Sequence, residues 1–316
     1  MSAGCWKTVF AEPFSSSAIA QMRQLGEVSE LPDCREEFLL DAVSDCDALL
    51  VKTRCQVTRR VIDAAPRLRV IGRGGIGLDN IDLKAAAARG IPVVYTPHAS
   101  TESVADLTFA LILGLTWNLT TCDLGVREGK FTALRNSFLT RELSALRLGI
   151  IGMGRIGCAV ARRAVHGFFM EVLYHDIVDP GDSLGISATR VEKEQLLSDC
   201  DIVSLHVPLT EQTQGLIGDD SFKRMRAGAL LINTSRGAIV DSAALVRSLR
   251  SGRLAGAGLD VFDPEPLPAD HELLTIPNTL FSPHVGARTA LAQARMNAVV
   301  DDVARVLKGE RPIYPA

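Results

Sequence analysis

The sequence lacks the features that direct a chain to a membrane, to secretion or to nucleic acid. No apolar run reaches the ~20 residues that span a bilayer. The N-terminus has no basic stretch followed by a long apolar segment, so no secretory signal is visible. A net charge of −3 gives no electrostatic basis for binding nucleic acid or an anionic membrane. We therefore expect a cytoplasmic protein that binds neither.

Closely spaced cysteines are also missing. The seven cysteines are odd in number, and no two are near enough in sequence to suggest a metal clip. Several have apolar or helical neighbours, so we interpret them as reduced thiols and predict no metal site. A hydrophobic content of 47% supports a sizeable core, and 316 residues favour two domains.

Strand-like and helix-like segments alternate along the whole chain. Before residue 100, strands are predicted at 8–10, 48–51, 69–71 and 93–94, and helices at 58–65 and 83–89. A long helix is predicted over 100–119, and a last one over 287–307. Such alternation is typical of parallel sheets with helices on both faces.

The most informative segment is LGIIGMGRIG at 148–157. It has the pattern of an apolar strand that ends in glycines spaced G-x-G-x-x-G, with a helix starting at Arg155. Gly152 permits a tight turn, Gly154 lets backbone approach a pyrophosphate, and Gly157 lets the helix pack on the strand. The N–H groups of the helix N-terminus suit phosphates.

A second strand-like run, 172–175, ends at Asp176. This acid lies about twenty residues past the last glycine, as the dinucleotide fingerprint requires. Its carboxylate can accept hydrogen bonds from a ribose diol and would repel a 2′-phosphate. Since Ile177 and Val178 follow it rather than an arginine, the sequence predicts NAD, not NADP. The alternative is a glycine-rich turn in some other doubly wound protein.

The fingerprint normally opens its domain, yet here it begins near residue 148. The first hundred residues therefore indicate a separate α/β unit, to which the last helix can return. We predict an α/β fold of two doubly wound parallel-sheet domains. A Rossmann NAD-binding domain, 100–286, is inserted into a flavodoxin-like substrate domain built from 1–99 and 287–316. A substrate should lie in the cleft between them.

Three further segments suit hydride transfer: Arg236 in NTSRG, Glu265 in DPEP and His284 in SPHVG, each at or beyond the end of a strand. An alcohol that loses a hydride must also lose a proton, so a base is needed. A carboxylate beside a histidine favours the imidazolium and fixes its tautomer. An arginine can clamp an α-carboxylate through two parallel hydrogen bonds and polarise the adjacent carbonyl.

From about residue 48 to residue 295 the chain resembles the NAD-dependent D-2-hydroxyacid dehydrogenases. The nearest resemblance is to the D-3-phosphoglycerate dehydrogenases, in a short form without C-terminal regulatory domains. The matching segments are GRGGIGLDN at 72–80, LHVPLT at 205–210, NTSRG at 233–237, GLDVFDPEP at 258–266 and SPHVG at 282–286.

The resemblance implies a role for each matching residue. Arg236 would bind the substrate carboxylate and carbonyl, His284 would be the general acid and base, and Glu265 its partner. Asp260 would bind the nicotinamide carboxamide. The implied cofactor contacts are Ser103, Gly152, Gly154, Arg155, Ile156, Gly157, Asp176, His206, Pro208, Thr213, Thr234, Asp260 and Gly286.

The expected substrate contacts come earlier in the chain. By resemblance, backbone N–H groups of Gly74, Gly75 and Ile76 would hold the substrate carboxylate. Where many relatives have arginine after the second strand, this chain has Lys52, which attracts an anion but cannot make a two-pronged contact. Arg73 adjoins the glycines and is the best candidate for a phosphate contact.

The substrate stays open at this stage. It is either 3-phosphoglycerate or a small acid such as glyoxylate or hydroxypyruvate. Formate dehydrogenases are disfavoured because they carry glutamine in place of Glu265, whereas phosphite dehydrogenases keep a similar trio. A non-enzymatic alternative is the NAD(H)-binding corepressors of the same fold, which carry tails beyond the last helix. We expect a homodimer whose partner is a small-molecule 2-hydroxy or 2-oxo acid.

Overall fold

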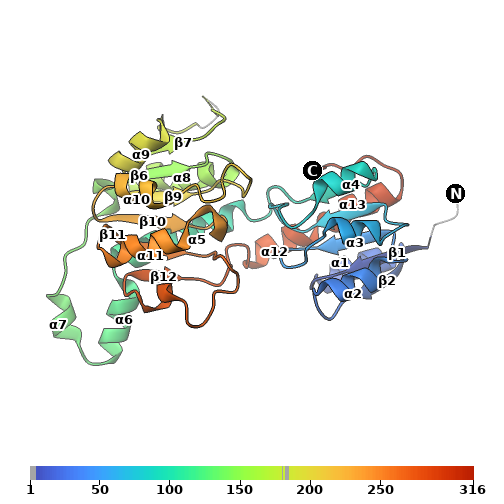
Figure 1. Ribbon diagram of the computed structural model, residues 1–316, viewed down its shortest axis with the longest axis horizontal. Coiled ribbons are helices and arrows are strands. Elements are labelled where there is room, and N and C mark those ends of the chain that lie inside the picture. Colours follow the sequence, from blue (N-terminus) through green and yellow to red (C-terminus); the bar gives the residue numbers. More distant parts are fainter. Residues whose placement is uncertain (1–4, 180, 182–184) are drawn as a thin grey trace. The chain divides into compact units, whose positions relative to one another are not determined.

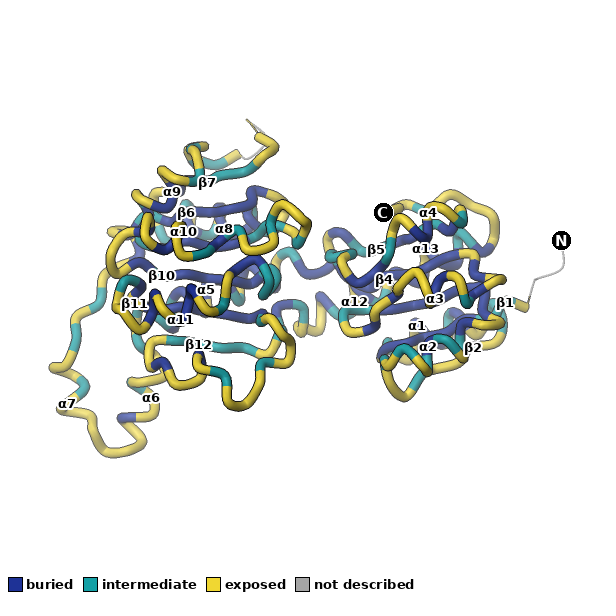
Figure 2. The backbone as a smooth tube through the Cα atoms, viewed as in Figure 1, coloured by how far each residue is buried: buried dark blue, intermediate teal, exposed yellow. Residues whose placement is uncertain are grey.

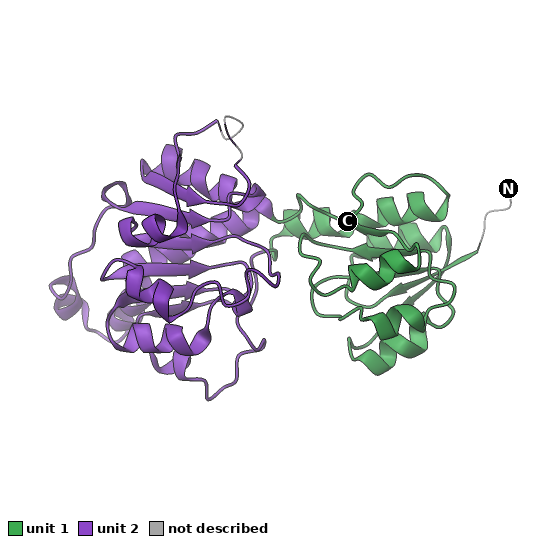
Figure 3. Cartoon of the chain, turned by 45° about the horizontal axis from the view of Figure 1, so that its top comes forward, with its two compact units in different colours: residues 1–100, 287–316 green, residues 101–286 purple. Residues whose placement is uncertain are grey.

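The computed structural model describes residues 5–179, 181 and 185–316. The chain divides into two compact units, shown in Figure 3: unit 1, Met1–Ser100 with Ala287–Ala316, and unit 2, Thr101–Gly286. Each unit is built on a wholly parallel sheet, and apolar cores lie on both faces of each sheet. The predicted fold class is confirmed.

Unit 1 has five strands in the order β2-β1-β3-β4-β5, which is the flavodoxin-like order. Their bounds are β1 Trp6–Phe10, β2 Gly26–Glu30, β3 Ala48–Val51, β4 Val70–Arg73 and β5 Val93–Tyr95. Strand β2 is absent from the sequence prediction. Its sequence, GEVSE, is polar because β2 is an edge strand with its side chains largely in solvent.

Helices cover both faces of this sheet (Figure 1). They are α2 Glu36–Val43, α3 Arg59–Asp63 and α4 Leu83–Ala88 on one face, and α1 Ser16–Arg23 and α13 Val299–Leu307 on the other. The final helix expected over 287–307 is two helices, α12 Ala290–Asn297 and α13, separated at Ala298. Helix α13 packs so closely on β4 that a Cβ at Gly72 would lie 2.5 Å from Val303 Cγ2.

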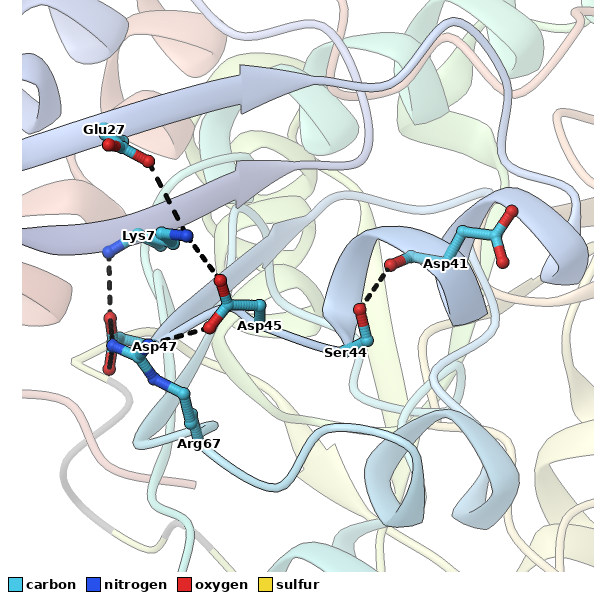
Figure 4. Close-up of polar contacts among 7 residues, drawn as sticks. All are labelled: Lys7, Glu27, Asp41, Ser44, Asp45, Asp47 and Arg67. Carbon is cyan, nitrogen blue, oxygen red and sulfur yellow. Dashed lines mark hydrogen bonds and ion pairs between the residues drawn. The ribbon is translucent and has the colours of Figure 1, made fainter.

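Charged side chains tie together the N-terminal edge of the unit 1 sheet (Figure 4). The buried Asp47 accepts hydrogen bonds from the Lys7 backbone N–H at 2.9 Å and from the Arg67 guanidinium at 3.2 Å. Asp45 pairs with the Lys7 ammonium and with Arg67, and its hydrogen bond to Lys7 lowers the pKa of the Asp45 carboxyl. These contacts thus join the strands where they begin, at the opposite end of the sheet from the loops that follow the strands.

Unit 2 has seven strands in the order β12-β11-β10-β9-β6-β7-β8. Their bounds are β6 Arg147–Ile151, β7 Glu171–His175, β8 Thr189–Arg190, β9 Ile202–Leu205, β10 Ala229–Asn233, β11 Leu254–Leu259 and β12 Thr279–Phe281. From β8 to β11 this is the Rossmann order 3-2-1-4-5-6, with β12 added at one edge. The first strand, β6, is flanked by β7 and β9, so the topological switch point lies beside it.

Buried strands run through the centre of unit 2, between helices whose outer sides are exposed (Figure 2). On one face lie α5 Thr101–Thr116 and α8 Arg155–Phe168, and on the other α9 Lys193–Asp199, α10 Asp219–Arg224 and α11 Ser242–Arg250. Among the described residues no single helix is long and apolar enough to cross a membrane. Helix α5 meets that test only together with α6 Leu119–Arg127, from which it is bent by 60°.

Helices α6 and α7 Phe131–Arg135 form an arm that extends away from the sheet of unit 2 (Figure 1). The helix expected over 100–119 ends at Thr116, because Asn118 adopts a left-handed conformation with φ 49° and redirects the chain. The arm and its root expose large apolar side chains, namely Trp117, Leu119, Leu124, Val126, Phe131 and Leu139.

Candidate active site

The candidate catalytic side chains of unit 2 follow the C-terminal ends of three adjacent strands. The last residues of β10, β11 and β12 lie opposite one another in register. The loops that follow therefore leave the sheet side by side, about 4.8 Å apart at their start. Arg236 follows β10, Glu265 follows β11, and His284 follows β12. Open α/β sheets bind ligands along this edge.

His284 and Glu265 form a direct pair. The His284 Nδ1 lies 2.9 Å from Glu265 Oε1, and the two side chains are 28% and 37% exposed. An ionised carboxylate only accepts hydrogen bonds, so the proton of the imidazole is held on Nδ1. The other nitrogen, Nε2, is then the one that exchanges a proton with a substrate oxygen.

The loop that carries His284 is held by Asp260. This carboxylate is 1% exposed. Its Oδ1 accepts from Ser282 Oγ at 2.6 Å and from the Val285 N–H at 2.8 Å, and its Oδ2 accepts from the Gly286 N–H at 2.9 Å. The His284 N–H donates to the Asp260 carbonyl at 2.8 Å. Asp260 is therefore a positioning residue for the histidine, a role that the sequence analysis did not identify.

His284 itself has a left-handed backbone, with φ 51°. Such a conformation in a residue other than glycine costs on the order of 1 kcal/mol and persists only where surrounding contacts hold it. The Asp260 hydrogen bonds supply those contacts. The observed strain thus coincides with the residue assigned to proton transfer.

Arg236 lies in a turn that the side chain of Asn233 builds. Asn233 is 1% exposed. Its Oδ1 accepts from the N–H and the hydroxyl of Ser235 at 3.0 and 2.8 Å, and its Nδ2 donates to the Arg236 carbonyl at 2.9 Å. At Gly237 a Cβ would lie 2.0 Å from the Phe262 backbone. The turn therefore packs directly on the loop that leads to Glu265.

The glycine loop has the geometry that a dinucleotide requires. Gly152 has φ 98°, and a Cβ there would lie 2.7 Å from the His206 backbone. A Cβ at Gly157 would lie 2.1 Å from the Gly152 carbonyl oxygen, so helix and turn touch. At Gly154, by contrast, a Cβ would meet no atom of the described chain within 4 Å. The residues fit a pyrophosphate at the N-terminus of α8, where Arg155 and Ile156 begin the helix.

Asp176 lies beside this loop at the end of β7. Its Oδ2 accepts from the Met153 N–H at 2.6 Å and its Oδ1 from the Val178 N–H at 2.9 Å. Each oxygen keeps acceptor capacity for a ribose hydroxyl. The structure also brings Arg190 to this place, since its guanidinium donates to the Asp176 carbonyl at 2.8 Å.

The segment after β9 lies next to the glycine loop in the sheet. His206 Nε2 is 2.8 Å from the buried Ser204 hydroxyl, and burial lowers the pKa of His206 to about 3. This imidazole is therefore neutral and is no proton carrier at ordinary pH. Thr213 Oγ1 donates to the Pro208 carbonyl and accepts from the Thr210 N–H, which makes the segment compact.

Three more expected cofactor contacts belong to unit 2. Thr234 is buried, with its hydroxyl 3.2 Å from that of Thr108 on α5, and Ser103 is buried in the first turn of the same helix. Gly286 is buried, and its N–H is bound by Asp260 as described above. Their contacts with the cofactor remain predictions.

The expected substrate loop of unit 1 follows β4. Gly74 and Gly75 are buried and Ile76 is half-buried. Arg73, expected to contact a phosphate, is 4% exposed, and its Nη1 donates to the Gly74 carbonyl at 3.1 Å. The same Nη1 lies 1.4 Å from where a Cβ of Gly75 would project, and Gly75 has φ 148°, so any other residue would displace the guanidinium and strain the backbone. In this structure the guanidinium supports the loop from inside the unit.

Lys52 follows β3, the strand next to β4. Its Nζ donates to Gln293 Oε1 at 3.0 Å and lies 4.7 Å from the centre of the Phe14 ring. Burial lowers the pKa of the Lys52 ammonium, and nearby Arg288 adds to this, while Glu12 opposes it. Gly74 also packs on the Phe14 ring. Lys52 and the glycine loop are thus neighbours, and two of the three ammonium donors of Lys52 stay available for an anion.

The unit 2 residues can perform acid–base chemistry coupled to hydride transfer. A bound NAD supplies or accepts the hydride. His284, held by Glu265 and by the Asp260 loop, can give or take the proton at the substrate oxygen. Arg236 provides a positive charge near the same edge for a carboxylate or a polarised carbonyl.

Comparisons with known proteins agree with this chemistry. Residues 109–286 match the family model described as "D-isomer specific 2-hydroxyacid dehydrogenase, NAD binding domain". The chain is 42% identical over 283 residues to a glyoxylate reductase of Korarchaeum cryptofilum, covering 88% of this chain and 84% of that protein. It is 38% identical over 308 residues to a D-3-phosphoglycerate dehydrogenase of Methanocaldococcus jannaschii, covering 96% of this chain but only 58% of that protein.

A solved structure extends the likeness to almost the whole chain. The D-lactate dehydrogenase of Aquifex aeolicus, complexed with NAD and lactic acid, superposes with a TM-score of 0.88 at 29% identity. The match covers 96% of each chain. Both units, and not the nucleotide-binding one alone, therefore have counterparts in known proteins.

Proposed function

The chain belongs to the NAD-dependent D-2-hydroxyacid dehydrogenase family, and we propose that its substrates are the small 2-oxo acids glyoxylate and hydroxypyruvate with their D-2-hydroxy acids. The family is one of oxidoreductases that act on CH–OH groups with a nicotinamide cofactor. The choice among its substrates depends on the cations near the glycine loop of unit 1.

The observation that carries the proposal is the burial of Arg73. A phosphate carries close to two negative charges and calls for at least two cations. Arg73 is buried and bonded to the Gly74 carbonyl, and Arg54 pairs with the Glu12 carboxylate at 3.5 Å. Lys52, beside the glycine loop, keeps two ammonium donors, which match one carboxylate. The glyoxylate reductase relative, of similar extent to this chain, also supports a small acid.

The second candidate is 3-phosphoglycerate. It is supported by the phosphoglycerate dehydrogenase relatives at 38% identity, of which the chain spans 58%. One observation in unit 1 favours it: exposed Arg288 is close enough to lower the pKa of the Lys52 ammonium. Lys52 and Arg288 together could balance a phosphate.

The test compares kcat/KM for glyoxylate, hydroxypyruvate and 3-phosphohydroxypyruvate with NADH. We expect efficient turnover of the two unphosphorylated acids and no gain from the phosphate. Lys52→Met should raise KM for all three acids, whereas Lys52→Arg should keep KM close to the wild-type value. A preference of about tenfold or more for the phosphorylated acid, the size expected for one charge-assisted hydrogen bond, would reject the proposal. In that case Arg288→Ala should remove the preference.

We further propose that the arm of α6 and α7 docks on a second copy of the chain. The arm and its root expose several large apolar side chains, and large exposed apolar surfaces on soluble proteins commonly mark interaction sites. At the root of the arm, a pocket of about 350 Å³ in unit 2 has a mixed lining, in which the apolar Leu115, Leu139 and Leu280 stand beside threonines and Asp201. A partner's arm offers apolar side chains, such as Leu124 and Phe131, for the apolar part of this lining.

Light scattering after size-exclusion chromatography tests the homodimer. We expect the wild type to have twice the mass of the chain, and Leu124→Glu with Phe131→Glu to have the mass of one. Ile177→Glu is the matched control. Ile177 is 93% exposed, but it follows strand β7 and lies far from the arm in the sequence. A wild-type monomer, or a dimer that survives the double substitution, would contradict the proposal.

We also propose a cytoplasmic location, because all seven cysteines are free thiols. Cell fractionation tests this location.

A further inference from the structure

Three side chains with metal-ligating atoms meet in unit 1, although they are far apart in the sequence. One carboxylate oxygen of Glu12 and the sulfur atoms of Cys34 and Cys55 all lie within 4.8 Å of one another. Glu12 follows β1, Cys34 follows β2 and Cys55 follows β3. These strands are neighbours in the order β2-β1-β3, so their C-terminal loops converge at the switch point of the sheet.

The cluster is enclosed by the unit rather than spread on its surface. The Glu12 side chain is 4% exposed, Cys55 is fully buried and Cys34 is half-buried. The Ala11 carbonyl oxygen lies 3.5 Å from Cys34 Sγ and 3.3 Å from Cys55 Sγ. The two sulfurs therefore lie close both to a carboxylate oxygen and to a carbonyl oxygen.

We propose that Glu12, Cys34 and Cys55 bind a thiophilic divalent cation, for which zinc is the best fit, with the Ala11 carbonyl as a fourth ligand. Zinc prefers four ligands in a tetrahedron, at about 2.3 Å from sulfur and 2.0–2.2 Å from oxygen. These lengths place neighbouring donors roughly 3.5–3.8 Å apart. From the 4.8 Å limit, the donors need to approach one another by at most about 1.3 Å.

The charges balance. Two thiolates and one carboxylate carry three negative charges, and a divalent cation leaves one. Arg54 lies 3.5 Å from Glu12 Oε2 and supplies the remaining positive charge. A buried site is most stable when its ions are paired in this way.

Glu12 also connects the site to the loop after β3. Its Oε1 accepts from the backbone N–H groups of Lys52, Arg54 and Cys55, at 2.8, 3.1 and 3.2 Å. A carboxylate has about four lone-pair sites, so Glu12 can accept from the loop and bind a cation at once. The bound ion would join the loops after three strands and hold the backbone of the loop that carries Lys52.

A cation suits the cluster better than a disulfide between the two cysteines. A disulfide would use the two sulfur atoms only, whereas a cation also takes the Glu12 carboxylate oxygen that lies within 4.8 Å of both sulfurs. A bound cation stabilises the thiolates directly, and binding releases their protons.

The test measures metal on the full chain, purified without chelators or a histidine tag. We expect about one zinc per chain by elemental analysis. Replacement by Co²⁺ should give a near-ultraviolet sulfur-to-cobalt charge-transfer band. Cys34→Ser and Cys55→Ser should each lose the band and weaken zinc binding more than about 100-fold, since a direct ligand matters more than an outer-shell partner. Cys122→Ser, a half-buried thiol of unit 2, is the matched control and should bind as the wild type does.

A fourth variant keeps the fold and removes only the charge. In Glu12→Gln the amide oxygen can still accept the three loop N–H groups, so a normal circular dichroism spectrum is expected together with weaker zinc binding. Zinc should raise the melting temperature of the wild type and of Cys122→Ser, but not that of Cys34→Ser. The proposal is overturned if folded wild type binds neither zinc nor cobalt stoichiometrically, or if Cys34→Ser binds equally well. A mass 2 Da below that of the reduced chain, with Cys34 and Cys55 in one disulfide-linked peptide, would overturn it too. None of these measurements depends on the substrate.

Discussion

Asp260 offers the sharpest test of how the fold positions the proton carrier. In Asp260→Asn, one carboxylate oxygen becomes an NH₂ group of the same shape. Both oxygens accept hydrogen bonds from the loop, so an N–H donor must face another donor whichever way the amide is turned. At least one charge-assisted hydrogen bond is lost, and one buried N–H is left unsatisfied. Together these cost about 2–5 kcal/mol.

The effect on activity follows from the displaced loop. Misplacement of His284 by about 1 Å lowers kcat on the order of 10²-fold. Hydrogen exchange should accelerate in the peptide that covers 282–286, and unfolding should begin at a lower temperature. Ser282→Ala is the control: it removes only the hydroxyl bond to Oδ1, so we expect a loss of about 1 kcal/mol and near-normal kcat. Wild-type exchange and a kcat within twofold of wild type in Asp260→Asn would refute the positioning role.

Three further predictions concern single groups of unit 2. Asp176→Ser should shift the ratio of kcat/KM for NADPH over NADH upward by about tenfold or more, because the repelling carboxylate is lost while Arg190 remains nearby; an unchanged ratio would remove Asp176 from the ribose site. His284→Ala should lower kcat by about 10²–10⁴ with KM little changed; near-normal turnover would assign the proton to another group. Burial lowers the pKa of His206 from 6.5 to about 3. Between pH 3 and pH 6.5 the unfolded chain therefore binds one more proton than the folded chain. Stability should therefore fall as the pH drops below 6.5, by about 1.4 kcal/mol per pH unit from this residue. Urea unfolding at pH 7 and pH 5 should show a smaller loss for His206→Gln, and an equal loss would contradict the buried neutral state.

The nucleotide-binding half could be predicted because its signals are contiguous in the sequence. Strand β6, the three glycines, helix α8, strand β7 and Asp176 follow one another without interruption, and each has a strong local preference. The buried strand β3 was equally visible as an apolar run. Strand β2 was not, because an edge strand needs no apolar face and GEVSE has none.

The contacts that support the site depend on which strands become neighbours, and no local pattern encodes this. The Glu265 and His284 pairing was predicted from the family resemblance and chemical complementarity. Asp260 can accept hydrogen bonds from the 282–286 loop only because β11 pairs with β12. The cluster of Glu12, Cys34 and Cys55 likewise requires the order β2-β1-β3. Sequence spacing alone therefore indicated no metal site there.

The arm of α6 and α7 was missed for a different reason. Its apolar residues interrupt a polar sequence without a regular period, and they face solvent in the single chain. Periodicity detects helices that bury one face within their own chain. It gives no signal for apolar side chains that face solvent in the single chain.

The return of the chain end to unit 1 has a consequence for biosynthesis. Val299, Val303 and Leu307 of α13 complete the core around Phe10 and Leu50. A ribosome adds about 5–20 residues per second, so the segment from residue 287 to residue 316 takes roughly 2–6 s to make. During that time unit 2, which is contiguous, can already fold, while one face of the unit 1 sheet has α1 but still lacks α13. The part of the protein that is translated first is thus the last to be finished, and it is the part of the nascent chain most in need of chaperone protection.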